Sequence, residues 1–100
     1  MDKYIIKISP RAIRDLDSIY YYLAHEKLAP ESAKRQIDRL KSAILGLSLF
    51  PHSHQMRLEG RFAKNGYRQL IVDNHVAVFR INEAEKTVMI ITIQHIRQNF

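Results

Sequence analysis

Residues 60–99 read GRFAKNGYRQLIVDNHVAVFRINEAEKTVMIITIQHIRQN. Three runs in this stretch, over 67–72, 75–81 and 87–94, are rich in the β-branched and aromatic residues that are typical of strands. Asp73-Asn74 joins the first two runs and suits a tight hairpin turn, because both residues tolerate positive φ. We therefore expect three consecutive antiparallel strands.

Two amphipathic helices are predicted before these strands. Ser9-Pro10 is a good helix start, since serine caps the first turn and proline fits the first helical position. Apolar residues then recur at helical spacing, with Asp15 on the opposite, polar face, and recur again over 33–47. Phe50-Pro51 ends the second helix.

A short β-prone run over 4–8 precedes the first helix. The expected fold is therefore α+β: an N-terminal strand, an antiparallel helix hairpin and a three-stranded antiparallel sheet, in the order β-α-α-β-β-β. One hundred residues suffice for one domain, which we expect to span residues 1–100.

Both faces of the expected sheet are largely apolar. Two helices cover only one of them, so we expect an open apolar face that a partner protein hides. If 83–86 is a four-residue loop, His95 shares a face with Arg80, and Arg68 lies on the other face.

The chain carries 16 basic and 10 acidic residues, for a net charge of +6 and a pI near 9.8. A basic domain of this kind suits a polyanionic partner, either nucleic acid or an acidic protein. The alternative is that the charge serves solubility alone.

Several classes of protein are excluded by what the sequence lacks. There is no cysteine for a disulfide or a zinc site, which fits a cytoplasmic protein. The first dozen residues do not resemble a secretory signal, and no apolar run is long enough for a membrane span. His52 and His54 have no carboxylate at metal-ligand spacing, so we expect neither a metal nor a cofactor.

The residues that could carry chemistry are basic. Cleavage of RNA by its own 2′-hydroxyl needs a base, an acid and cations that neutralise the developing charge, all of which histidine and arginine supply. The candidates are Arg61, Arg68, Arg80 and Arg97, together with His95 and Glu59. Alternatively, His95 is an ordinary hydrogen-bonded residue at a strand end, and Arg80 pairs with a helix carboxylate.

The order of elements, with SPRAIRDLDSIYYYLA at 9–24, LSLFPHSHQMR at 47–57 and YRQLIVDNHVAVFRINEAEKTVMIITIQHIRQN at 67–99, resembles the RelE/ParE superfamily of bacterial toxins from type II toxin–antitoxin modules. The resemblance covers nearly the whole chain. It implies a cytoplasmic growth inhibitor without a cofactor, held in a hetero-oligomer by its cognate antitoxin, a small acidic protein that wraps the sheet and helices.

Members of this superfamily either cut messenger RNA on the ribosome or, in the ParE branch, inhibit DNA gyrase. For a nuclease, the resemblance implies that His95, Arg68, Arg61 and Arg97 are catalytic. For either target it implies a binding surface made of Arg61, Arg68, Arg80 and Arg97, with the segment 94–100 beside Arg61 and Arg68.

The basic cluster of the nucleases is incomplete here, because Leu70 stands where the next basic residue is expected. Together with the long helix hairpin, this favours the ParE branch. A ribosome-dependent, metal-independent mRNA endonuclease is the alternative, and only that alternative makes the protein an enzyme. A third possibility, a non-toxic RNA-binding module, needs exposed aromatic residues on the sheet, for which Phe79 is the good candidate on the Arg68 face.

Overall fold

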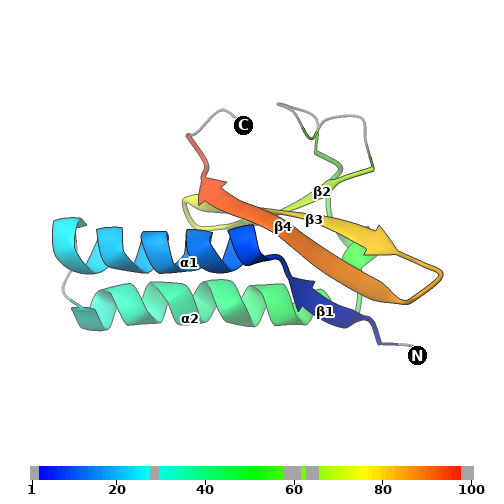
Figure 1. Cartoon of the computed structure of the whole chain (residues 1–100), viewed down its shortest axis with the longest axis horizontal. Helices are drawn as coiled ribbons and strands as arrows, with labels where there is room; N and C mark the ends of the chain where they lie inside the picture. Colours follow the sequence, from blue (N-terminus) through cyan, green and yellow to red (C-terminus); the bar gives the residue numbers. More distant parts are fainter. Residues whose placement is uncertain (1–2, 28–29, 58–61, 63–65, 98–100) are drawn as a thin grey trace.

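The computed structural model describes residues 3–27, 30–57, 62 and 66–97 (Figure 1). It confirms the expected α+β fold and the order β-α-α-β-β-β. The elements are β1 (Ile5–Ile8), α1 (Pro10–Tyr22) with a π-helical turn (Leu23–Lys27), α2 (Pro30–Gly46), a 3-10 turn (Pro51–Ser53), β2 (Arg68–Val72), β3 (His75–Asn82) and β4 (Thr87–His95).

The helix starts follow the predicted chemistry. The Ser9 hydroxyl oxygen accepts a hydrogen bond from the Ala12 N–H at 3.0 Å and thereby caps α1. Pro30 occupies the first position of α2. The helix α2 ends at Gly46, a few residues before the stop predicted at Phe50-Pro51, because the chain turns over 47–49 before that proline.

The four strands form one sheet in the order β1-β4-β3-β2. The strands β2, β3 and β4 are antiparallel neighbours, and β1 lies parallel to β4. The tight hairpin turn predicted at Asp73-Asn74 is confirmed, with Val72 opposite His75 and a φ of 55° at Asp73. At the β2 edge of the sheet, an isolated antiparallel bridge pairs Met56 with Arg68.

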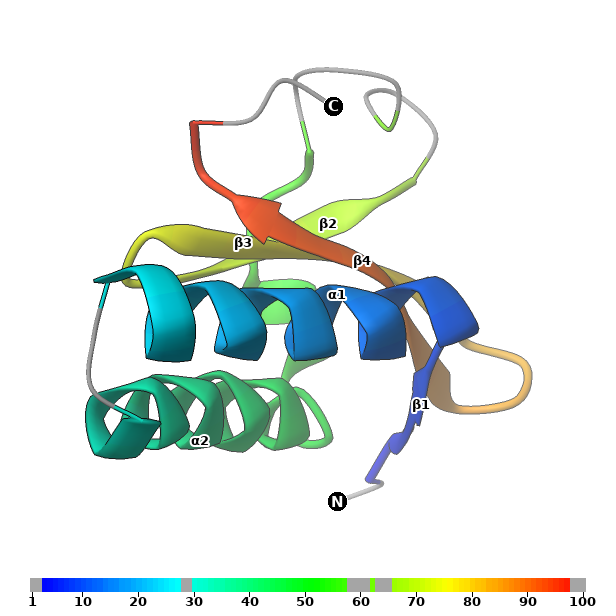
Figure 2. The ribbon, with the colours of Figure 1, turned by 60° about the vertical axis from the view of Figure 1, so that its left-hand side comes forward.

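Both helices lie on one face of the sheet, which we call the helix face (Figure 2). Side chains from this face and from the helices form the core. It comprises Ala12, Leu16, Ile37, Leu40, Ile44, Leu47, Leu70, Ala77, Phe79, Val88, Ile90 and Ile93.

The opposite face, which we call the second face, is less open than expected. Val76 and Val78 alternate with core residues and so point to this face, yet they are only 1% and 0% exposed. Near them, the buried ring of Phe62 packs edge-on against Tyr67. The prediction of an uncovered apolar face is therefore wrong at the centre of the sheet, and Ile71 is an apolar residue that remains exposed toward its edge.

A β-bulge changes which residues of β4 share a face. Val78 pairs with Thr92 and Phe79 with Ile90, so Ile91 is an extra residue. Consequently His95 lies on the helix face. The predicted placement of His95 on the face of Arg80 is wrong for this reason.

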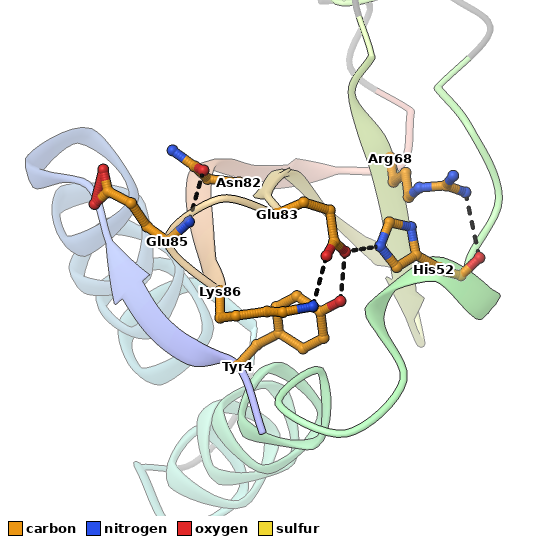
Figure 3. A network of polar contacts seen from close by, with 7 residues as sticks. All are labelled: Tyr4, His52, Arg68, Asn82, Glu83, Glu85 and Lys86. Carbon is orange, nitrogen blue, oxygen red and sulfur yellow. Dashed lines mark hydrogen bonds and ion pairs between the residues drawn. The ribbon is translucent and has the colours of Figure 1, made fainter. Parts of the chain in front are cut away.

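A polar network ties three separate segments of the chain together (Figure 3). The Glu83 carboxylate accepts hydrogen bonds from the Tyr4 hydroxyl and from Lys86 Nζ, the latter at 2.8 Å, and it pairs with His52 Nε2. The bonds from Lys86, Tyr4 and His52 lower the pKa of Glu83 to about 2. We call these four residues the Glu83 network. They join the start of the sheet, the β3–β4 loop and the turn after α2.

We predict that Glu83→Gln lowers the melting temperature at pH 7 measurably. The folded carboxylate has a pKa below its ordinary value of 4.5, so its contribution is complete above that pH and is lost toward pH 2. The difference between the two proteins in thermal melts should therefore shrink on acidification. Glu85→Gln, in the same loop but outside the Glu83 network, is the control, and an equal effect of both variants would contradict the prediction.

Candidate functional site

A groove of about 720 Å³ opens where α1, the β2–β3 turn and the end of β4 meet. In Figure 2 the turn and the tip of β4 lie above the C-terminal half of α1. The groove has a mixed lining of apolar and polar side chains. Its aromatic, imidazole and cationic groups are Tyr22, His75, His95 and Arg97.

His75 and His95 are paired across β3 and β4, and their ring centroids are 5.5 Å apart at an interplanar angle of 78°. His75 is buried, and its Nδ1 has no hydrogen-bond partner among the described residues. Burial lowers the pKa of His75, and the nearby His95 lowers it further, because a second positive charge would be repelled. His75 is therefore held toward its neutral form.

Backbone hydrogen bonds after β4 orient His95. The Arg97 N–H donates to His95 Nδ1 at 3.1 Å, so a neutral His95 carries its proton on Nε2. A second backbone hydrogen bond, from the Ile96 N–H to the Asn74 carbonyl at 2.7 Å, fixes this segment to the β2–β3 turn.

Asp15 holds the outer edge of β4 at the base of the groove. Its Oδ2 accepts from the Thr92 hydroxyl at 2.6 Å and from the Ile93 N–H at 3.0 Å. Its Oδ1 lies 3.4 Å from Gln94 Nε2. The sequence analysis placed Asp15 on the polar face of the first helix, and the structure corrects this, because the residue is half-buried against β4.

Arg68 is far from this groove. It pairs with Phe79 whereas His95 pairs with His75, so the two lie about 13 Å apart along the strands, with β3 between them. The Arg68 guanidinium donates to the His54 carbonyl at 2.7 Å and to the His52 carbonyl at 3.4 Å. Residues 94–97 therefore do not lie beside Arg68, contrary to the prediction, because Arg68 lies opposite the middle of β3, whereas the end of β4 lies opposite the first residue of β3.

The remaining sequence-predicted residues are dispersed. Arg80 lies on the second face, where its guanidinium carbon is 5.6 Å from the centroid of the Tyr67 ring. Arg97 is exposed at the mouth of the groove. Arg61 and Glu59 lie outside the described residues. Of the predicted set, the structure thus brings together His95 and Arg97, and it adds His75 to them.

Within the described ranges, no three His, Cys, Asp or Glu side chains come together in an arrangement that could hold a metal ion. A membrane-crossing helix is also not found in that part of the chain, since none there is both long and apolar enough.

Residues 6–100 match a family described as the ParE toxin of the type II toxin-antitoxin system, parDE. The chain belongs to the ParE toxin family. This confirms the resemblance to the RelE/ParE superfamily. A comparison with curated protein sequences found no match.

Solved structures of proteins from toxin-antitoxin systems share this fold. A chain of the chromosomal ParDE system from P. aeruginosa is 22% identical with a TM-score of 0.75, over 95% of this chain and 98% of that chain. A chain of the RelBE2 toxin-antitoxin complex from Mycobacterium tuberculosis is 23% identical with a TM-score of 0.64, over 95% and 93%. One from the intact E. coli RelBE complex is 12% identical with a TM-score of 0.59, over 95% and 99%.

The sequence analysis missed His75 and Asp15 as parts of this ParE groove. A signal for His75 was available, because it is the first residue after the hairpin turn and pairs across the sheet with the end of the next strand. No local signal marked Asp15, since its partners on β4 lie 77 and 78 residues away.

We predict that His75 titrates below the ordinary histidine pKa of 6.5 and that His95→Ala moves its titration upward, because a repelling neighbour is removed. A histidine with a lowered folded pKa contributes stability above pH 6.5 that is lost on acidification. In the His75→Gln variant, the free energy of unfolding should therefore fall less between pH 7.5 and pH 5.5 than in the unmodified protein. Imidazole NMR signals and urea unfolding measure these effects. A His75 pKa at or above 6.5 would show that burial does not control this group.

Proposed function

We propose that this protein is the toxin of a type II toxin–antitoxin module and that it inhibits DNA gyrase when it is not bound by its antitoxin. Membership of the ParE toxin family over residues 6–100 is the observation that carries this proposal. The described basic residues support the choice of target, because their arrangement suits binding to a surface better than cleavage of a phosphodiester.

A metal-independent nuclease needs its base, acid and cations within hydrogen-bond reach of one phosphate. Arg68 is held by loop carbonyls and lies about 13 Å from His95 along the strands, with β3 between them. Arg80 lies on the opposite face of the sheet. These three residues therefore cannot act together on one scissile bond without a large rearrangement.

One observation favours the mRNA endonuclease as a second candidate. His75 and His95 stand 5.5 Å apart beside Arg97 in an open groove. Two imidazoles could supply a base and an acid, and the guanidinium could neutralise a phosphate. In that case His75 would replace Arg68 in the catalytic set.

The RNA-binding module loses its main support. Phe79, the aromatic residue on which that hypothesis rested, is fully buried and belongs to the hydrophobic core. Its ring is therefore not available for stacking on a base.

We propose a small acidic antitoxin as the partner in a cytoplasmic hetero-oligomer. The net charge of +6 favours an acidic protein, and two of the similar structures are toxins in toxin-antitoxin complexes. Exposed apolar side chains near the end of α2 provide contact area for it. These are Leu45, Leu49 and Phe50.

We predict that expression without the antitoxin arrests growth and that the purified toxin blocks negative supercoiling of plasmid DNA by gyrase. In a ribosome-containing extract it should leave messenger RNA intact. Agarose gels and primer extension measure the two outcomes separately. Cleaved messenger RNA with normal supercoiling would replace gyrase inhibition by the nuclease function, and an absence of both effects would contradict both.

We also predict that deleting residues 96–100 weakens growth arrest strongly while changing the melting temperature little. Ile96 and Arg97 are exposed, and their backbone N–H groups donate hydrogen bonds to the Asn74 carbonyl and to His95 Nδ1, outside the hydrophobic core. As a contrast, Leu40→Ala in the core should cost about 2–5 kcal/mol of unfolding free energy. Full toxicity of the truncated chain would place the target-binding surface elsewhere.

A further inference from the structure

We infer that the second face of the sheet binds the phosphate backbone of duplex DNA through a transverse row of cationic side chains. We call Lys7, Arg80 and Arg57 the cationic row. They come from β1, from β3 and from the segment that extends the β2 edge. Lys7 and Arg57 were not among the residues that the sequence analysis selected.

The strand register aligns these residues. Lys7 and Arg80 both pair with Met89, one from each side of β4, so the three lie next to one another across the sheet. Arg80 in turn lies against the ring of Tyr67. The Arg57 N–H donates to the Tyr67 carbonyl at 2.8 Å, which continues the row by one more strand spacing.

The length of the row matches a stretch of DNA backbone. Neighbouring strands are about 4.8 Å apart, so Lys7 and Arg80 are separated by about 10 Å and the whole row spans about 19 Å. Phosphates follow one another at about 3.4 Å of axis per strand, so the row covers about six base pairs. Long lysine and arginine side chains can adapt to such spacing.

Beside the cationic row, the second face carries amides, which can also donate hydrogen bonds to phosphate. These are Gln55, Gln69 and Asn82, and the Gln69 side-chain oxygen accepts a hydrogen bond from the Arg57 guanidinium at 2.9 Å. Along β1 to β4, no described residue that alternates onto the second face is acidic. Asp15 reaches it at the far end of β4, where its carboxylate is engaged by Thr92 and the Ile93 N–H.

The aromatic residues of this face favour duplex DNA over single-stranded RNA. Proteins that read single strands stack bases on exposed rings. Here the Tyr67 ring has Phe62 on its edge at 5.1 Å between centroids and the Arg80 guanidinium over it. The described residues of this surface thus offer cations and no open ring, which suits phosphates and not bases.

The inference deepens the proposed function, on which its biological setting rests, because gyrase acts on DNA. A toxin with such a face would contact the DNA segment that gyrase holds as well as the enzyme. Binding to DNA alone nevertheless tests the face without gyrase. Failure of the two proposals can therefore be told apart.

The test is fluorescence anisotropy with the purified full chain and a labelled 20-base-pair duplex between 50 and 200 mM KCl. Two or three phosphate contacts predict a slope of log K against log salt of about −1.8 to −2.7, so binding weakens roughly 12- to 40-fold over this range. The double variant Lys7→Gln/Arg80→Gln should have a slope that is smaller by about 1.8. Its remaining binding should therefore weaken by no more than about four-fold between 50 and 200 mM KCl.

Matched variants separate the face from the net charge. Lys34→Gln/Lys41→Gln removes the same charge from exposed positions of α2 and should leave the slope unchanged. Lys7→Arg/Arg80→Lys keeps both charges and should retain binding. Thermal melts confirm that each variant is folded.

Three results would overturn the inference: no binding at 50 mM KCl, an equal loss in the α2 variant, or tighter binding to a single-stranded RNA of the same length. Binding that depends on Lys7 and Arg80 supports it even if gyrase is not inhibited. That combination would remove only the proposed target.

Discussion

The carboxylate of Asp15 secures the edge of β4 beyond the end of β1, and the end of the sheet that bears the groove depends on this contact. The strand β1 pairs with β4 only as far as Ile8 and Ile90. Past that point the Ile93 N–H would lie at a buried edge without a partner, at a cost of about 1–3 kcal/mol. Because α1 begins directly after β1, it carries Asp15 to this N–H and covers the strand itself.

The same junction decides what each face of the sheet presents. The Ser9 hydroxyl donates to the carbonyl of Ile91, the extra residue of the bulge, at 2.8 Å. The bulge turns His95 toward α1, where it meets His75 above the groove. On the second face the register is uninterrupted below the bulge, so Lys7, Met89 and Arg80 stay in line. The helix face thus presents imidazoles to a groove at one end of the sheet, and the second face presents cations nearer the other end.

Prediction from the sequence succeeded wherever the signal was local. The turn residues Asp73-Asn74 gave the hairpin register, and Ser9-Pro10 gave the start of α1. It failed for the outer half of β4, because counting back from the loop 83–86 assumes an unbroken ladder. It also placed Arg68 beside the C-terminal segment. Residue type and order along the chain do not tell how far the start of β2 lies from the end of β4.

The sequence by itself determined the order of helices and strands, the basic character and the membership of the toxin family, because periodicity, turn chemistry and motif order are local properties. Only the tertiary structure decided that His75 joins His95 and that Lys7 joins Arg80. The first depends on the bulge in β4 and the second on the parallel pairing of β1 with β4. At the bulge and beyond it, Ser9 and Asp15 bind residues of β4 that lie 77 to 82 positions away. Contacts between residues so distant in the chain arise from packing, which no window of the sequence contains.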